Sequence, residues 1–284
     1  MQVTWVFPGL FVVLWSTGFI GAKLGLPYAE PFTFLSLRFI FVLAILLPIC
    51  WLLKARWPNR TGVGHMAIAG VLMQGGYLGG VFASLHQGMP AGVSALITGL
   101  QPVCTAVLGA WLLHERPTPR QWLGLALGLC GVALVVGDRI AVQSLTAPAT
   151  LLSVLALASI TLGTIWQKRH GGAIDLRTGA AIQFAAAALV LAPFAFLLET
   201  RRVVWSGEFV FALAWLVLVL SFGAVFLLFY LIRHGAATRV ASLFYLVPPT
   251  TALIAWPLFA ESYSLTAAAG MGLGMLAVWL VTKP

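Results

Sequence analysis

Residues 91–135 read AGVSALITGLQPVCTAVLGAWLLHERPTPRQWLGLALGLCGVALV, two apolar runs joined by a short loop of charged residues and prolines. Shifted by 146 positions, this stretch overlays residues 237–281 without a gap. The matched positions include Pro102 with Pro248, Glu115 with Glu261, Gly124 with Gly270 and Gly128 with Gly274. Apolar composition alone does not place prolines and glutamates at one fixed separation, so the sequence predicts an internal duplication.

The earlier parts of the two halves agree at a shift of 145 positions. The matched positions are Gly18 with Gly163, Lys23 with Lys168 and Phe39 with Phe184, and Arg38 falls opposite Gln183. We therefore expect one domain made of a first repeat over residues 1–140 and a second repeat over residues 147–284.

The composition excludes a soluble protein. Of the 284 residues, 61% are hydrophobic and 8% are charged, and the mean hydropathy is +1.01. Soluble domains carry about 25% charged residues, so most of this chain must face lipid or other apolar helices. The lipid bilayer is therefore its first expected partner.

Ten stretches are long and apolar enough to be membrane spans. A span needs about 20 mostly apolar residues, and it must be helical because lipid offers no hydrogen-bond partners to the backbone. The expected spans are residues 4–23, 31–53, 65–86, 91–113, 119–137, 147–168, 178–199, 208–232, 238–259 and 265–282.

Each repeat then has five spans, and the odd number turns the second repeat upside down in the membrane. We expect an all-α integral membrane fold of ten transmembrane helices arranged as two inverted five-helix repeats. Inverted repeats are the architecture of many secondary transporters, in which two half-structures exchange conformations to give alternating access. The alternative is a duplication that only builds a stable bundle.

Positive charge predicts the orientation. Eleven of the 16 lysines and arginines fall on one side of the predicted spans, four fall on the other, and Arg38 lies inside a span. The richer side is expected to be cytoplasmic, which places both termini there. The net charge of +9 is explained by this bias, so no nucleic-acid partner is expected.

Two segments resemble the drug/metabolite transporter superfamily, specifically the EamA-type exporters. They are LWSTGFIGAKLGLPYAEPFTFLSLRF at 14–39 and the run at 92–134, with its Pro, its Leu-x-x-x-Glu end and its Gly-rich helix. The resemblance implies an inner-membrane exporter of amino acids, other metabolites or amphipathic compounds, driven by a proton or counter-substrate gradient. No phosphate-binding loop of the G-x-x-x-x-G-K-[ST] type is present.

Arg38 is the most informative single residue, because it lies about seven residues into its span, roughly 10 Å deep. An ionisable group at that depth should face a cavity or a partner. One interpretation is a contact for an anionic substrate group such as a carboxylate. The other is a structural arginine that reaches the interface or binds helix-end carbonyls.

Polar and aromatic residues of several spans are candidates to line a substrate pathway. Besides Arg38, they are Trp15, Ser16, Thr17, Gln74, Tyr77, Thr98, Gln101, Thr161, Trp166, Tyr230 and Tyr245. Gln101 precedes Pro102, and Tyr245 stands three residues before Pro248. Breaks of this kind in paired helices point to a transporter site. The alternative role for each residue is hydrogen bonding between helices.

Three further residues are candidates for gating or coupling. Glu115 and Glu261 end matched spans, where they serve either as coupling carboxylates or as caps of the following helix. His86 lies between two spans and could sense pH.

The remaining patterns suggest no cofactor and no metal. Cys50, Cys104 and Cys130 lie inside apolar runs, and no Cys/His pair has the spacing of metal ligands. The Gly-rich spans after Glu115 and Glu261 predict close helix packing, either within the monomer or in a homodimer.

We therefore expect a secondary transporter that exports small amphipathic metabolites such as amino acids. The alternatives are a non-transporting membrane scaffold or subunit and, less favoured, an integral membrane enzyme.

Overall fold

The computed structural model describes residues 6–112, 118–141, 146–234, 243–244, 246–260 and 264–282. The helices are α1 (Val6–Gly25), α2 (Pro31–Leu52), α3 (Arg60–Gly70), η1 (Val71–Gly76), α4 (Tyr77–His86), α5 (Ala91–Thr98), α6 (Gln101–Leu112), α7 (Pro119–Ala141), α8 (Ala147–His170), α9 (Leu176–Leu198), α10 (Gly207–Ala214), η2 (Trp215–Ala224), α11 (Val225–His234), α13 (Val247–Phe259) and α14 (Leu265–Thr282). In these residues, extended pairing is limited to one bridge between Ala29 and Val203.

Six helical segments are long and apolar enough to cross a membrane. They are Phe7–Gly25, Pro31–Leu52, Arg60–His86, Ala147–His170, Leu176–Leu198 and Gly207–Leu231. Shorter apolar helices cover Ala91–Thr105, Trp122–Gly131, Val247–Phe259 and Leu265–Ala277. The chain is thus an all-helical protein with several membrane-spanning helices, and the count of ten remains a prediction.

The expected span at 91–113 is interrupted in the structure. α5 ends at Thr98 and α6 begins at Gln101. Pro102 has no N–H to donate to the carbonyl of Thr98, so the regular series of helical backbone hydrogen bonds stops there. The Leu100 amide instead bonds to the Ile97 carbonyl at 3.2 Å, and the Thr98 hydroxyl bonds back to the Ser94 carbonyl at 2.8 Å.

The expected span at 65–86 begins earlier, at Arg60, because the Asn59 side chain accepts from the Gly62 amide and caps α3. This span also contains a π-helical stretch, η1, between α3 and α4. A second π-helical stretch, η2, lies between α10 and α11. Such stretches often occur at functional sites.

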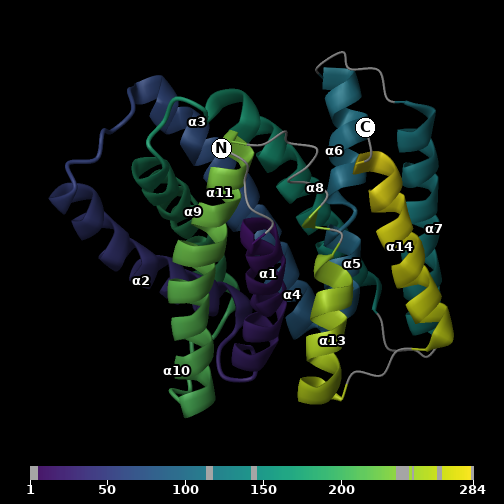
Figure 1. Cartoon of the computed structure of the whole chain (residues 1–284). Helices are drawn as coiled ribbons and strands as arrows, with labels where there is room; N and C mark the ends of the chain where they lie inside the picture. Colours follow the sequence, from purple (N-terminus) through teal and green to yellow (C-terminus); the bar gives the residue numbers. More distant parts are fainter. Residues whose placement is uncertain are drawn as a thin grey trace.

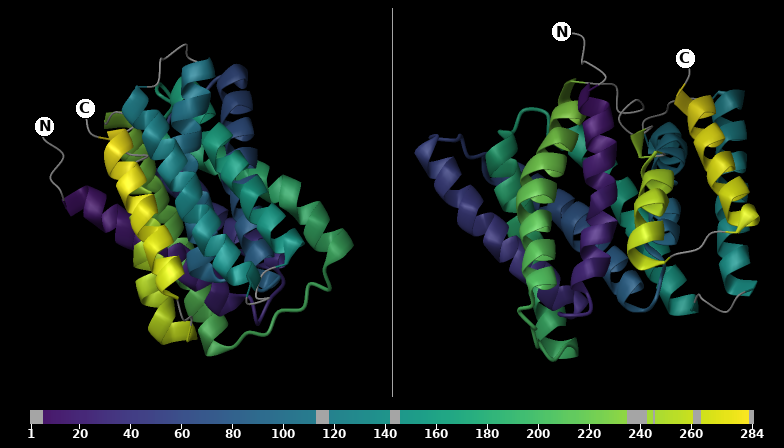
Figure 2. Two further views of the ribbon diagram at one scale, coloured as in Figure 1. Left: turned by 90° about the vertical axis from the view of Figure 1, so that its right-hand side faces the viewer. Right: turned by 60° about the horizontal axis from the view of Figure 1, so that its bottom comes forward.

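α5 and α6 contact both α8 and α7, so they join the α7–α14 pair to the rest of the bundle (Figure 1). α2 packs on α9, and α1 lies between α13 and the α10–η2 helix. α8 packs on α3, η1 and α4, and α7 packs along α14. Figure 2 shows α7 and α14 side by side at the edge of the molecule.

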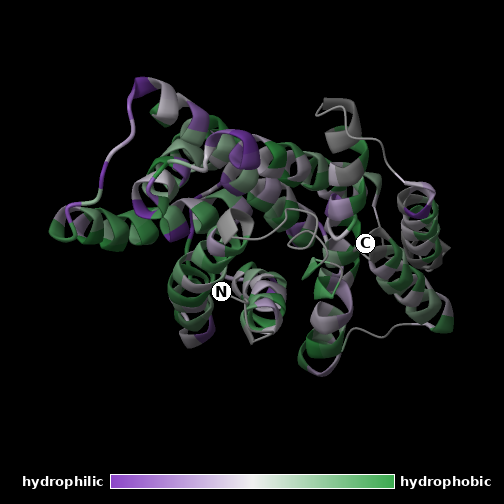
Figure 3. Ribbon diagram, turned by 45° about the horizontal axis from the view of Figure 1, so that its top comes forward, coloured by the Kyte–Doolittle hydropathy of each residue, from purple (hydrophilic) through white to green (hydrophobic). Residues whose placement is uncertain are grey.

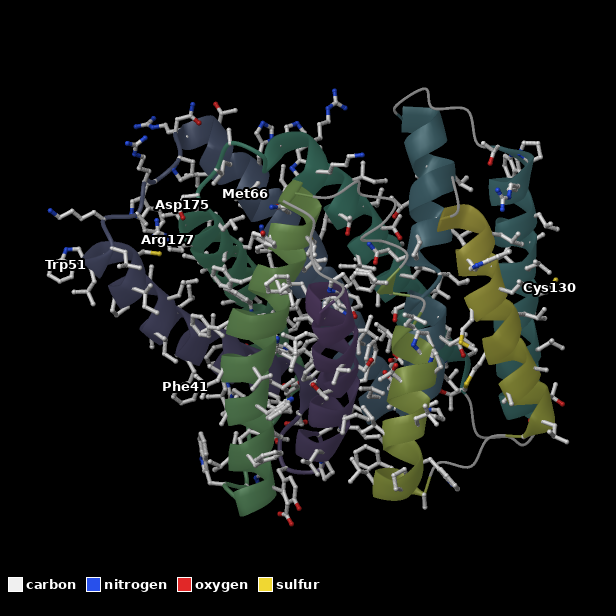
Figure 4. The ribbon with its side chains drawn as sticks, viewed as in Figure 1. Phe41, Trp51, Met66, Cys130, Asp175 and Arg177 are labelled. Carbon is white, nitrogen blue, oxygen red and sulfur yellow. The ribbon has the colours of Figure 1, made fainter. Side chains whose placement is uncertain are left out.

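Exposed apolar side chains cover much of the outside of the bundle. Phe41 and Trp51 point away from it on α2, and Cys130 does so on α7 (Figure 4). Trp51 is 79% exposed. Hydrophilic residues gather instead in the connection between α2 and α3 and at neighbouring helix ends (Figure 3). This distribution suits a lipid-facing surface with polar ends.

The bundle has two ends, the Glu30 end and the Arg56 end, each called after one of its residues. The Glu30 end carries the connections that follow α1 and α9, and the Arg56 end carries the connections that follow α2 and α8. α1 begins and α14 ends toward the Arg56 end (Figures 1 and 2).

A reciprocal carboxylate clamp joins two connections at the Glu30 end. Glu199 accepts hydrogen bonds from the Phe32 and Thr33 amides, each at 2.7 Å, and so caps the start of α2. Glu30 accepts from the Thr200 amide and hydroxyl, each at 2.7 Å, and from the Arg201 amide at 3.1 Å. Charge-assisted bonds of this kind are stronger than neutral ones.

Small residues let α3 approach α9. A Cβ atom placed on Gly70 would collide with the backbone of Gln183, whereas one placed on Gly64 of the same helix meets nothing within 4 Å. Relief of the collision would require the two helices to separate, because the opposing atoms are backbone.

We predict that Gly70→Ala destabilises the protein by about 1–3 kcal/mol, the usual cost of overpacking. Gly64→Ala is the matched control and should leave stability within about 0.5 kcal/mol of the parent, as for other surface changes. Thermal unfolding in detergent measures both. Equal melting temperatures for the two variants would contradict the close approach of α3 and α9.

The clamp also predicts a pH dependence. Hydrogen bonds from the Thr200 hydroxyl, then from the Thr200 and Arg201 amides, hold the pKa of Glu30 below its ordinary value. The clamp bond therefore contributes stability above the ordinary glutamate pKa of about 4.3, and that contribution is lost as the pH falls through the lower folded-state pKa.

Glu30→Gln should consequently lower the melting temperature at pH 7 and flatten its fall between about pH 5 and pH 3, since this carboxylate no longer takes up a proton. Melting curves of the parent and the variant across this range test the prediction. Parallel curves, with the same slope at every pH, would be inconsistent with it.

Candidate functional site

A cavity lies inside the bundle, between helices of both halves of the chain. Its empty volume is about 540 Å³, part of it continuous with the surroundings of the protein. α1, α2, η1 and α4 line it from the first half, and α8, η2 and α11 line it from the second half. Most of its walls are apolar, and its polar side chains are Trp15, Arg38, Gln74 and Tyr77.

Arg38 is buried in the wall of this cavity, with 3% of its surface exposed. Its Nε and Nη2 atoms both donate to the hydroxyl oxygen of Ser221, each at 3.1 Å. The Ser221 hydroxyl in turn donates to the Leu216 carbonyl at 3.0 Å, five residues earlier in η2. A π-helical carbonyl therefore fixes the serine that orients the guanidinium.

A stacked aromatic pair separates this cavity from a second one. The rings of Trp15 and Tyr77 lie 6.4 Å apart between centroids, with 13° between their planes. The second cavity has an empty volume of about 210 Å³. Both cavities share Trp15, Phe19, Tyr77 and Ile160.

The break between α5 and α6 supplies the polar groups of the second cavity, Thr98 and Gln101. The Gln101 amide nitrogen donates to the Thr164 hydroxyl of α8 at 2.8 Å. Gln101 Oε1 is buried and accepts no hydrogen bond from the described residues. It is a free acceptor for a donor placed in this cavity.

A third space, of about 180 Å³, surrounds Gln183 toward the Arg56 end. Gln183 is the residue that the sequence overlay pairs with Arg38. Its amide nitrogen donates to Gln167 Oε1 at 2.9 Å, and its own Oε1 has no partner among the described residues. Asp175, next to Arg177 at the start of α9 (Figure 4), also borders this space.

Six of the sequence-predicted residues line the first two cavities: Trp15, Arg38, Gln74, Tyr77, Thr98 and Gln101. They come from α1, α2, η1, α4, α5 and α6, so the fold gathers residues that are far apart in the chain.

Five others do not line either cavity: Ser16, Thr17, Thr161, Trp166 and Tyr230. The three hydroxyls donate to carbonyls of their own helices, as Thr161 does to Leu157 at 2.7 Å. Thr17 also accepts from the Trp215 indole at 3.0 Å. Ser16 also reaches the Val247 carbonyl at 3.4 Å, so Ser16 and Thr17 each bond to a second helix as well as to their own.

Trp166 lies at the Arg56 end, where its indole nitrogen donates to the His65 carbonyl at 3.1 Å. The rings of His65 and His170 stack beside it at 4.0 Å. The Tyr230 ring lies 6.2 Å from that of Phe7.

His86 is exposed at the end of α4, on the Glu30 end. Glu115, Glu261 and Tyr245 lie outside the described residues.

The sequence analysis missed Ser221, the hydrogen-bond partner of Arg38. One signal could have found it, because Ser221 is the only hydroxyl residue in the otherwise apolar run Trp215–Ala224. The clamp of Glu30 and Glu199 was also missed, since its two connections are about 170 residues apart in the chain.

Comparison with protein families gives a match over residues 4–137 and 147–283 to a family described as the EamA-like transporter family. A solved structure matches with a TM-score of 0.71 at 20% identity, covering 98% of this chain and 95% of the other. At that identity it supports the fold alone.

Several relatives are named as transporters. A probable amino-acid metabolite efflux pump of Salmonella typhimurium is 28% identical over 160 residues, which are 56% of this chain and 52% of that protein. The chain thus matches about half the length of this relative. An uncharacterized transporter of Bacillus subtilis, YvbV, is 26% identical, with 95% of this chain and 88% of the relative covered. An uncharacterized inner membrane transporter of Escherichia coli, YedA, is 23% identical, with 99% and 92% covered.

Proposed function

The chain belongs to the EamA-like transporter family, and we propose that it is a secondary transporter of the inner membrane. It exports small amphipathic metabolites such as amino acids by alternating access, driven by a proton or counter-substrate gradient. The name of the Salmonella relative supports the substrate class, and the name of the Escherichia coli relative supports the inner membrane.

One observation carries the proposal: the cavity around Arg38 is mostly apolar, holds a few convergent polar groups, and is walled by helices of both halves. Ligand sites typically combine apolar walls with a small number of placed polar groups. A cavity between two halves is also where relative movement of the halves would open a path to either side.

Matched features of the two halves support an inverted repeat. Pro48 of α2 and Pro193 of α9 are 145 positions apart, and these two helices pack on one another. η1 falls within η2 at the same shift. The α5–α6 break also packs on the start of α13, where Gly99 faces Pro248.

The pattern of helix contacts agrees with this arrangement. α1 packs on η2 and on α13, while α8, its counterpart in the second half, packs on η1 and on α6. These two contacts of α1 thus each have a counterpart with the halves exchanged, as a two-fold axis in the membrane plane would give. With ten spans, the lysine and arginine bias places the Arg56 end and both termini in the cytoplasm.

A membrane scaffold or an integral membrane enzyme would be the alternative. A scaffold has no need of an internal cavity with placed polar groups between its halves. The family and the named relatives are transporters, which is not an enzyme class.

The proposal predicts that proteoliposomes containing the protein exchange radiolabelled leucine or a related amino acid faster than protein-free liposomes. Ile160→Trp should lower that flux roughly tenfold or more, because the larger ring fills the wall shared by both cavities.

Leu162→Trp is the matched control, because Leu162 lies two residues away on α8 and is 43% exposed. It should leave the flux near the parent value. Flux no greater than in protein-free liposomes would rule out transport of this substrate class. An equal loss of flux in the two variants would show that the substrate does not pass through the cavity.

A further inference from the structure

We propose that Arg38 selects substrates that carry one carboxylate, so that the carrier transports zwitterions or monoanions with an apolar body and discriminates against cations. This inference rests on the proposed transport function and names the substrate class of the same cavity. It stands on the charge balance around Arg38, on the way its guanidinium is held, and on the walls around it.

No carboxylate is among the described residues that line the cavity around Arg38. Glu115 and Glu261 lie outside the described residues, and the other five carboxylates each lie between two helices or in the first or last turn of a helix: Glu30, Asp138, Asp175, Glu199 and Glu208. The hydrogen bonds of Arg38 go to Ser221, a neutral hydroxyl. A buried cation is costly unless it is paired, so a negative group in the cavity would be strongly favoured.

Ser221 holds one edge of the guanidinium and leaves the remainder for a ligand. A guanidinium has five N–H donors, of which Ser221 accepts two, on Nε and Nη2. The Nη1 donors and the second Nη2 donor are left. A carboxylate can accept two parallel, charge-assisted bonds from such donors. A neutral acceptor lacks the charge assistance, and an ammonium has no lone pair with which to accept.

The other cavity walls determine the rest of the substrate. Phe19, Val81, Leu220 and Leu228 surround the cavity with apolar surface, to which a hydrophobic side chain would bind. Gln74 and Tyr77 supply neutral hydrogen-bonding groups. With one arginine and no other cation lining the cavity, a single carboxylate is balanced, whereas a second would be buried without a partner.

The competing role for Arg38 is structural, since its bond to Ser221 joins α2 of the first half to η2 of the second. That role would affect every substrate alike, because loosened packing does not depend on the charge of the ligand. Specificity is a difference between ligands, so a set of probes that differ only in charge separates the two roles.

The experiment uses the full-length protein in proteoliposomes and three labelled probes with one carbon skeleton. Leucine has a carboxylate and an ammonium, 4-methyl-2-oxopentanoate has the carboxylate without the ammonium, and leucinamide has the ammonium without the carboxylate. The parent protein should transport the first two and should transport leucinamide much more slowly.

Arg38→Gln should lower the flux of leucine and of 4-methyl-2-oxopentanoate roughly 10- to 100-fold, the loss expected for a charge-assisted pair. Leucinamide flux should stay unchanged or rise, because a like charge has been removed from its path. Arg38→Lys should keep part of the carboxylate flux, since it keeps the charge but loses the planar fork.

Arg177→Gln is the matched control, as it makes the same substitution outside the main cavity, and it should leave all three fluxes unchanged. Melting temperatures in detergent identify any variant that fails to fold. In that case Ser221→Ala, which frees the guanidinium without removing it, should raise the KM for leucine more than the KM for leucinamide.

The outcomes separate failure of the inference from failure of the proposed function. Efficient leucinamide transport by the parent, or an equal loss of all three fluxes in Arg38→Gln, would overturn carboxylate selection and leave transport standing. No flux of any probe above protein-free liposomes would overturn both for this class of compounds.

Discussion

Backbone hydrogen bonding in an apolar medium is the constraint on which this structure depends. Lipid offers no partners, so the lipid-facing chain must be helical, and irregular backbone is tolerated only where protein or a cavity surrounds it. The interruptions obey this rule. η1, η2 and the break at Gly99 each contribute residues to the wall of an internal cavity. Where the regular helical hydrogen bonding is interrupted, backbone and side-chain groups become available to bind a ligand.

A charged side chain is costly to bury in the same apolar medium, so the position of each charge bears on function. Only 8% of the residues are charged, and the carboxylates that the structure describes lie near helix ends, where amides and water can solvate them. Arg38 departs from this pattern because it is buried among helices and bonded to a serine hydroxyl. A cation in that place stabilises the empty protein poorly, which favours a role that is completed by a negative ligand.

Much of the fold could be predicted from the sequence, because apolar run length and proline positions act locally. The helical class and the interruption near Pro102 follow from them. The site was predicted in part. Trp15, Tyr77 and Gln101 reach the cavities, whereas Trp166 bonds to the His65 carbonyl and Ser16 bonds to its own helix. Sequence cannot separate these cases, because the direction of a side chain depends on helix rotation and on partners far away in the chain.

Residues that the sequence overlay matches make different hydrogen bonds at the two ends of the bundle. Glu30 and Asp175 are matched at the shift of 145, yet Glu30 bonds across to Thr200, whereas Asp175 bonds to Arg177 on its own helix. At the Arg56 end, the corresponding link is a neutral bond from the Thr178 hydroxyl to the Arg56 carbonyl at 2.9 Å. Charge-assisted bonds are the stronger kind, so these two matched links differ in strength. The inverted repeat proposed above would supply two similar conformations, and such differences between matched residues would favour one of them over the other.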